Sequence, residues 1–184
     1  MQQMLLLLLA IIVLALYAFG QQMDYIRAQE VAVSREMEVA MMDVHQIWGS
    51  HMANLAFAEE IADGTIDPGS LSSADLPSLA RPLGPDPLPG TTLLESGPAQ
   101  FDDFDDFNGY STSNYLFPVR GVDMPFTVEV VGVWYTADDE SVSSTPTAVK
   151  SALLRVSYVS PRQDLPAGED RISLDQIVKL SING

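Results

Sequence analysis

The residues best suited to chemistry stand in one short acidic run, Phe101-Asp-Asp-Phe-Asp-Asp-Phe-Asn-Gly109. Four carboxylates fall within five positions, and carboxylate and amide oxygens are the ligands that Ca²⁺ takes in proteins. If the turn folds tightly, Asp103, Asp105 and Asn108 converge on one cation. A solvated acidic turn is the favoured interpretation, in which the three phenylalanines, at every third position, anchor the turn to the core. A Ca²⁺ site at the Asp102–Asp106 turn is the less favoured alternative.

No pattern in the sequence favours catalysis. His45 and His51 stand six residues apart, so they do not share a helix face as the histidines of an HExxH motif do. Such positions are typical of a helix surface or an interface. The chain has no cysteine, which excludes a thiol nucleophile, a thiolate metal site and disulfides. GxSxG, P-loop and GxGxxG motifs are absent too. We therefore expect no enzymatic activity, no catalytic residues, and no cofactor other than Ca²⁺.

The length and charge of the chain limit its class. Its 184 residues suffice for one compact domain and one extended element. The formal net charge is −16, from 25 acidic and 9 basic residues, and such a surface repels phosphate backbones. We therefore expect no nucleic-acid partner. Anionic lipid headgroups are repelled for the same reason, so contact with a membrane must come from an apolar segment.

An apolar block, Met4–Phe19, lies near the start of the sequence and holds no charged residue. Three interpretations compete. A secretory signal peptide needs a basic beginning, yet no Lys or Arg precedes Arg27, although Ala18-Phe19-Gly20 has the small-x-small form of a cleavage site. A permanent membrane anchor needs about 20 apolar residues, and the block is slightly shorter. The third interpretation is the core helix of a filament, held in the membrane before assembly.

We favour the filament core, because a helix that is apolar all round cannot be covered by the small domain of its own chain. It needs lipid or other copies of itself. The residues that we expect to mediate assembly are Leu5, Leu6, Leu9, Ile12, Val13, Leu16 and Phe19.

The segment after the block predicts a long helix. No proline occurs before Pro68, and helix-forming residue types dominate. Apolar residues recur at spacings of three and four, which places them on one helix face. These are Met37, Met41, Val44, Trp48, Met52 and Leu55. We expect the helix to run to about Ile61, where Gly64 stops it. Gly20 and Gly49 are the points where it is expected to bend or melt.

The remaining sequence predicts a loop and then a sheet. Prolines and glycines crowd residues 65–100, so we expect an extended loop anchored by leucines, or else a disordered linker. The leucines are Leu71, Leu76, Leu79, Leu83 and Leu88. Four later segments have strand composition, most with period-two alternation. They are Asn114–Val119, Phe126–Ala137, Ala148–Ser160 and Arg171–Ile182.

These segments predict an antiparallel meander with one face on the helix and the other in water. In the second segment, one face is expected to hold Phe126, Val128, Val130, Gly132 and Trp134. The fold class is therefore α+β, a long N-terminal helix with an apolar first third, packed on a C-terminal antiparallel β-sheet domain. Its parts are the apolar filament-core or membrane segment 1–22, the amphipathic continuation 23–63, the loop with the acidic turn 64–110 and the β domain 111–184.

This architecture resembles the type IV pilin and pseudopilin superfamily. Within it, the stretch Phe101–Tyr110 resembles the acidic DDxDDxxG segment of minor pilin-like proteins. The resemblance implies a structural subunit of an extracellular pilus-like filament at the cell surface, inserted in the inner membrane before assembly. Its partners would be copies of itself, the inner membrane and the pilus assembly machinery.

Two features depart from the family pattern. The prepilin processing site, a glycine followed by Phe-Thr-Leu-Ile-Glu, is absent, and Leu5 stands where many pilins carry glutamate. Without that glutamate the usual pairing with a neighbour's N-terminal amine cannot form, so the register in a filament would depend on apolar packing. Two other functions stay open. One is a monomeric, membrane-anchored accessory or adhesion protein that displays the acidic domain, and the other is a secreted binding domain with a cleaved signal.

Overall fold

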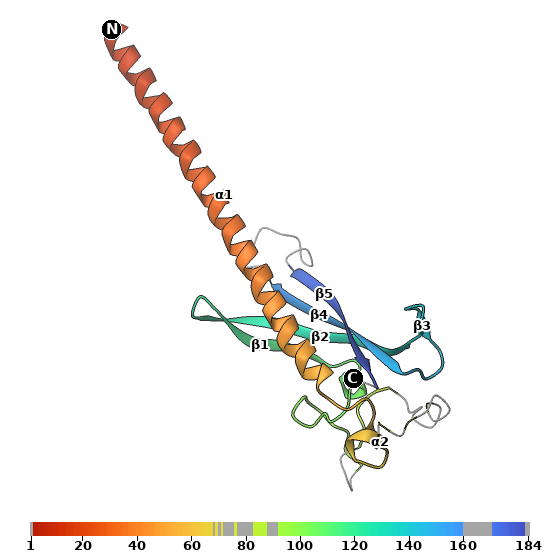
Figure 1. Ribbon diagram of the computed structural model, residues 1–184. Coiled ribbons are helices and arrows are strands. Elements are labelled where there is room, and N and C mark those ends of the chain that lie inside the picture. Colours follow the sequence, from red (N-terminus) through yellow and green to blue (C-terminus); the bar gives the residue numbers. More distant parts are fainter. Residues whose placement is uncertain are drawn as a thin grey trace. The chain divides into compact units, whose positions relative to one another are not determined.

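The structure, a computed structural model, has an α+β fold with one long N-terminal helix and a five-stranded antiparallel sheet (Figure 1). It describes residues 2–67, 69, 71, 76, 83–87, 92–159 and 171–182, without the side chains of Gln2, Leu5, Val159 and Arg171. The chain forms two compact units, Met1–Val39 and Ala40–Gly184. The predicted fold class is confirmed.

Helix α1 spans Gln2–Ala53 and continues through both glycines that were expected to weaken it. From Ala40 onward it packs on the sheet, where the His45 Nε2 atom lies 3.2 Å from the carbonyl oxygen of Leu154. The predicted apolar stripe is buried, and its members are at most 7% exposed as far as Met52. They are Met37, Met41, Val44, Trp48 and Met52.

Helix α1 ends at Ala53 and not near Ile61, so the predicted end of the helix is wrong. The cause is a backbone bridge between Ala56 and the acidic turn. The Ala56 N–H donates to the carbonyl of Asp102 at 3.3 Å, and its carbonyl accepts the N–H of Phe104 at 3.0 Å. These bonds occupy the backbone groups that would otherwise continue the helix.

A short helix, α2, follows at Glu59–Ala62. Gly64 has a φ of +72° just beyond it, which is the left-handed conformation that commonly ends a helix. The predicted stop at Gly64 therefore ends α2 and not α1. Between the two helices, Phe57 is 4% exposed and begins a second part of the core.

The sheet consists of β1 (Ser111–Val119), β2 (Val122–Thr136), β3 (Val142–Ser143), β4 (Val149–Val159) and β5 (Arg171–Ser181). The order is β1-β2-β4-β5, with β3 paired to β2 and every pair antiparallel. This is the predicted meander. Strands β1 and β2 join through Arg120 and Gly121, whose φ values of 52° and 78° suit a two-residue hairpin turn.

In β2 the predicted single face holds only for the first half. Its buried residues there are Phe126, Val128 and Val130, each 0% exposed. The pairing with β4 then shifts between Val130 and Gly132. Such a bulge adds one residue to one strand and reverses the alternation beyond it. Val133 and Tyr135 are consequently buried, whereas Trp134, expected on the core face, is half-buried.

A second core cluster lies beside the end of the sheet. Phe57, Ala58 and Tyr135 form its centre. Partly buried apolar residues pack against it, namely Ile61, Ile66, Leu71, Leu76, Leu83, Leu180 and Ile182. Three leucines of the proline-rich loop therefore anchor it as predicted. The other two, Leu79 and Leu88, lie outside the described residues.

Candidate functional site

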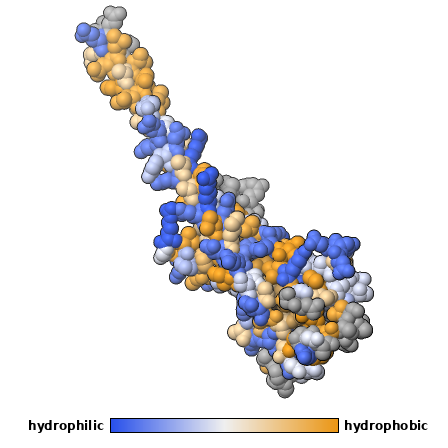
Figure 2. All heavy atoms as spheres, in the orientation of Figure 1, coloured by the Kyte–Doolittle hydropathy of each residue, from blue (hydrophilic) through white to orange (hydrophobic). Residues whose placement is uncertain are grey.

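The first part of α1 exposes the apolar side chains that were expected to mediate assembly (Figure 2). Leu6, Leu9, Ile12, Val13, Leu16 and Phe19 are 47–67% exposed. The side chain of Leu5 lies outside the described residues. The helix is long and apolar enough to cross a membrane, and the rest of the chain buries none of its apolar window. A membrane anchor and a signal sequence share this property.

One face of this segment forms an apolar groove along the helix. It is lined by Leu6, Leu9, Ala10, Val13, Leu14 and Tyr17. Residues spaced by three and four lie on the same helix face, so the lining is one continuous stripe. Ala10 is the small residue in the stripe and leaves space between its larger neighbours.

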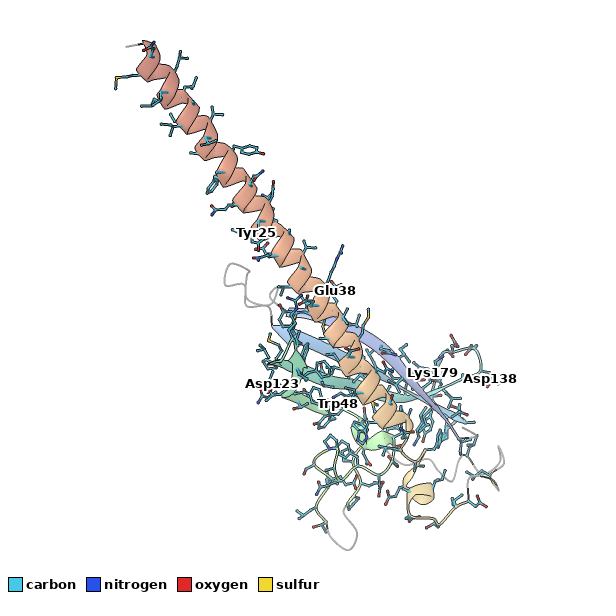
Figure 3. All side chains as sticks on the ribbon, turned by 60° about the vertical axis from the view of Figure 1, so that its left-hand side comes forward. Tyr25, Glu38, Trp48, Asp123, Asp138 and Lys179 are labelled. Atoms are coloured by element: carbon cyan, nitrogen blue, oxygen red, sulfur yellow. The ribbon has the colours of Figure 1, made fainter. Side chains whose placement is uncertain are left out.

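The acidic run folds into a compact turn that is buried and not solvated. Its three phenylalanines are at most 7% exposed, which confirms that they anchor it to the core. Asp105–Phe107 forms one turn of 3₁₀ helix, η3. Trp48 packs on the turn from α1, stacked on Tyr110 at 5.6 Å and edge-on to Phe107 at 6.3 Å between ring centroids (Figure 3).

The turn buries three of its four carboxylates. Asp103, Asp105 and Asp106 are 2%, 7% and 1% exposed, and Asp102 is exposed. The Asp103 Oδ1 atom accepts the backbone N–H groups of Asp105 and Asp106 at 2.8 and 3.3 Å. The Asp106 carboxylate accepts the N–H groups of Asp86, Asp102 and Asp103 at 3.1–3.3 Å. Buried carboxylates need such partners because they have lost their water.

Lys150 of β4 is the lysine that meets this turn in the described part of the chain. Its side chain is 0% exposed, forms an ion pair with Asp105 and donates a hydrogen bond to the carbonyl of Phe57 at 2.5 Å. The ammonium also lies over the rings of Phe57 and Tyr135, 4.6 and 5.7 Å from their centroids. Burial raises the pKa of Asp105, although Lys150 acts in the opposite direction. Lys150 therefore joins the sheet, the turn and the segment after α1.

The three predicted Ca²⁺ ligands, Asp103, Asp105 and Asn108, each contact different partners in the structure. Asp105 faces Lys150. The Asn108 amide donates to the carbonyl of Leu83 at 2.6 Å, and its oxygen accepts the N–H of Val133 at 3.0 Å. Asn108 therefore fixes the loop to β2. Only Asp103 remains in a group of carboxylates.

The acidic turn meets three carboxylates from other parts of the chain. Two groups form, and within each the ligand oxygens lie within 4.8 Å of one another. The first is Glu59, Asp86 and Asp103, and the second is Glu95, Asp102 and Asp106. The sequence prediction missed Glu59, Asp86 and Glu95. No local pattern marks them, because α2 and the proline-rich loop must first fold against the turn.

This crowding changes the acid–base properties of the carboxylates. Burial, together with a hydrogen bond to Asp102, raises the pKa of Glu59 to about 7. Burial and a hydrogen bond to Asp106 raise the pKa of Glu95 to about 8. Burial and the charges of its neighbours in the turn raise the pKa of Asp103 to about 8. Near neutral pH the cluster therefore holds protons.

The two histidines occupy the kinds of position that the sequence predicted. His45 is 1% exposed between α1 and the sheet, with its ring nitrogens 2.9 Å from the Met41 carbonyl and 3.2 Å from the Leu154 carbonyl. His51 is exposed, and its ring centroid lies 5.8 Å from that of Phe107. Both are packing positions on one helix.

Comparison of the chain with protein-family models, curated proteins and solved structures finds no significant match. The resemblance to pilins therefore depends on the architecture and on the acidic motif alone.

Proposed function

We propose that this chain is a structural subunit of an extracellular filament that polymerises through the apolar part of α1. The observation that carries the proposal is the exposure of that segment. Every large apolar side chain described from Leu6 to Phe19 is at least 47% exposed. An apolar surface of this extent is stable only when lipid or another protein surface covers it.

The groove around Ala10 favours another helix as the cover. A stripe spaced by three and four accepts the side chains of a second helix between its own. Inside a membrane or a filament core, a small residue at such a contact lets two helices approach closely. A second copy of this chain supplies a matching stripe.

The distribution of charge agrees with a filament that has an apolar core and an acidic exterior. No charged side chain precedes Asp24, so every one of the 25 acidic residues lies from that position on. The apolar segments can therefore bundle without burying a charge, while the acidic domains stay in water.

A second candidate is a monomeric membrane-anchored protein that displays its acidic domain. The length and apolar character of α1 favour it equally, because lipid also covers such a segment. The two candidates differ in whether copies of the chain contact one another through the groove.

Electron microscopy of material sheared from the cell surface, labelled with antibodies against residues 111–184, tests the proposal. We expect labelled filaments that contain this chain along their whole length. Recovery of the chain only as monomers in the membrane fraction would support the anchored candidate and refute the filament.

A variant of the groove makes the test specific. Ala10→Trp keeps the segment apolar but fills the groove, so we expect membrane insertion to persist and filaments to be lost. Ala15→Trp is the matched control, because Ala15 lies about 140° around the helix from Ala10. Equal loss of filaments in both variants would show that the groove is not the contact.

A further inference from the structure

Glu95, Asp102 and Asp106 form a carboxylate group at the acidic turn. Their ligand oxygens lie within 4.8 Å of one another. This spacing fits oxygens that share one Ca²⁺, because twice the Ca–O distance is about 5 Å. Asp102 is exposed, so an ion can enter from solvent. Carboxylates often lie this close without an ion, so the surroundings of Glu95 decide.

The side chain of Glu95 is buried within this group. The residue is 7% exposed, and its Oε2 atom is buried without a hydrogen-bond partner. Its carboxylate lies within 4.8 Å of ligand oxygens of Asp102 and Asp106. A buried carboxylate oxygen without a partner is strongly destabilising, because it loses its hydrogen bonds to water and gains none within the protein. The missing partner is either a cation or a proton shared with a neighbouring carboxylate.

The backbone already supplies hydrogen-bond donors to Asp106, whereas the Oε2 atom of Glu95 has none. The Asp106 carboxylate accepts three backbone N–H groups, from Asp86, Asp102 and Asp103. These bonds fix the direction of the Asp106 carboxylate. Lys150 is engaged with Asp105 and Phe57.

We propose that Glu95, Asp102 and Asp106 bind one divalent cation, and that Ca²⁺ is the cation they suit. The donors are hard oxygens drawn from loop segments, and Ca²⁺ accepts six to eight such ligands in irregular geometry. Mg²⁺ demands a nearly ideal octahedron and gives up its water reluctantly, so the site should prefer Ca²⁺. The adjoining group of Glu59, Asp86 and Asp103 adds negative charge that strengthens the attraction.

The position of the ion indicates what it does. Glu95 and Asp86 belong to the proline-rich loop, where the Glu95 N–H donates to the Asp86 carbonyl at 3.0 Å. Asp102 and Asp106 belong to the turn that packs under α1. One ion would therefore fasten the loop to the domain in a chain that has no disulfide. The site would stabilise the domain whether or not the chain forms filaments.

A shared proton is the competing explanation. Burial and Asp106 raise the pKa of Glu95 to about 8, so without a cation this carboxyl holds a proton at neutral pH and donates it to Asp106. A shared proton without a cation site predicts no saturable response to Ca²⁺, whereas the cation site binds Ca²⁺ and releases the proton as it does so.

The test measures binding and thermal unfolding with the full chain in detergent micelles, after removal of metal with EDTA. Calorimetric titration with CaCl₂ at about pH 9 should show saturable binding, with a Kd near or below about 10⁻³ M, the range of extracellular Ca²⁺ modules. Binding of MgCl₂ should be at least about 10-fold weaker. At about 100 times the Kd, Ca²⁺ should raise the Tm by roughly 10 °C.

Two variants locate the ion. Glu95→Gln keeps a donor for Asp106 but removes the charge, so the metal-free Tm should be unchanged or higher, and the rise with Ca²⁺ should disappear. Asp102→Asn changes an exposed residue and should weaken binding about 10-fold or more without unfolding the domain. Asp138→Asn is the matched control, because Asp138 is exposed in the turn after β2 (Figure 3).

The outcomes are separable. Loss of the Ca²⁺ response in Glu95→Gln and its weakening in Asp102→Asn, with Asp138→Asn unchanged, establish the site. Absence of saturable Ca²⁺ binding in the unmodified chain overturns the proposal in favour of the shared proton. Equal responses in all three variants overturn it as well, because the binding would then be general to the acidic surface. None of these results depends on whether filaments form.

Discussion

Lys150 is the residue on which the acidic turn depends most. Its ammonium, 0% exposed, meets the Asp105 carboxylate and the Phe57 carbonyl inside the domain. Removing one partner of a buried ion pair leaves the other charge without water, which costs about 3–5 kcal/mol. We therefore expect Lys150→Met to lower the free energy of unfolding by about that amount. Urea denaturation of the full chain in micelles, followed by tryptophan fluorescence, measures it.

The control for this prediction is Lys179→Met. Lys179 also pairs with an acid, Glu140, at 2.8 Å, but both side chains are largely exposed. Exposed pairs contribute little to stability, so this variant should unfold almost as the unmodified chain does. Adding Asp105→Asn to Lys150→Met should recover part of the loss, because no buried charge then remains unpaired. If both lysine variants were equally stable, the buried pair would not hold the turn.

The carboxylates beside this pair predict a pH dependence in the absence of divalent cations. The pKa values of Glu95 and Asp103 are raised to about 8 in the folded chain, above their usual values near 4. The folded chain then holds protons that the unfolded chain has released. Since stability falls with pH wherever the folded state binds more protons, the free energy of unfolding should decrease between about pH 5 and 8.

Midpoints of urea unfolding, measured in EDTA between about pH 5 and 8, test whether stability decreases with pH as expected. The charged groups that face Glu95 are Asp106, Asp102 and Glu59. Glu95→Gln removes one titrating group and should flatten the decrease. A midpoint that rises steadily from about pH 5 to 8 would contradict the raised pKa values.

At the scale of elements, α1 is held to the sheet by one face. Met41 is 1% exposed against the sheet, while Met42, its neighbour in sequence, is 57% exposed. Met41→Ala should destabilise the domain by about 2–5 kcal/mol, because it removes buried methylenes and leaves a cavity. Met42→Ala should change the free energy of unfolding by no more than about 0.5 kcal/mol. Similar losses in both, measured by denaturation, would mean that α1 does not use this face.

The elements whose signals are local could be predicted from the sequence. Alternating apolar residues and the turn residues between them gave four strands, and β4 and β5 match their predicted bounds to within one residue. The helix stripe was equally readable, because a spacing of three and four needs no knowledge of the partner. The phenylalanine spacing in the acidic turn likewise predicted its anchoring to the core.

The features that were predicted wrongly or missed depend on contacts between segments that are distant in the sequence. The end of α1 at Ala53 follows from the backbone bridge between Ala56 and the acidic turn. The bulge before Gly132 follows from the register with β4. In the carboxylate cluster, the burial of Asp105 depends on Lys150, which is 45 residues away in sequence. No local pattern reports such partners.

At the scale of the whole molecule, assembly must overcome repulsion between acidic domains. Each chain carries a net charge of −16. The screening length is about 30 Å at 0.01 M salt and about 10 Å at 0.1 M, so repulsion between neighbours weakens as salt is added. We therefore expect the fraction of chain that sediments as filaments to increase with NaCl over this range. A fraction that decreases with salt would show that charge attraction, and not apolar packing, holds the filament.

Copies of this chain are proposed to contact one another through the apolar part of α1. Because the chain has no cysteine, Leu9→Cys introduces a single thiol on that segment. Oxidation of intact cells should give covalent dimers, while Val142→Cys, 71% exposed on β3, reports random collision and should stay largely monomeric. Dimers of Leu9→Cys in the sheared surface fraction are the predicted result. If Leu9→Cys gave no more covalent dimer than Val142→Cys, copies of the chain would not contact one another through this segment.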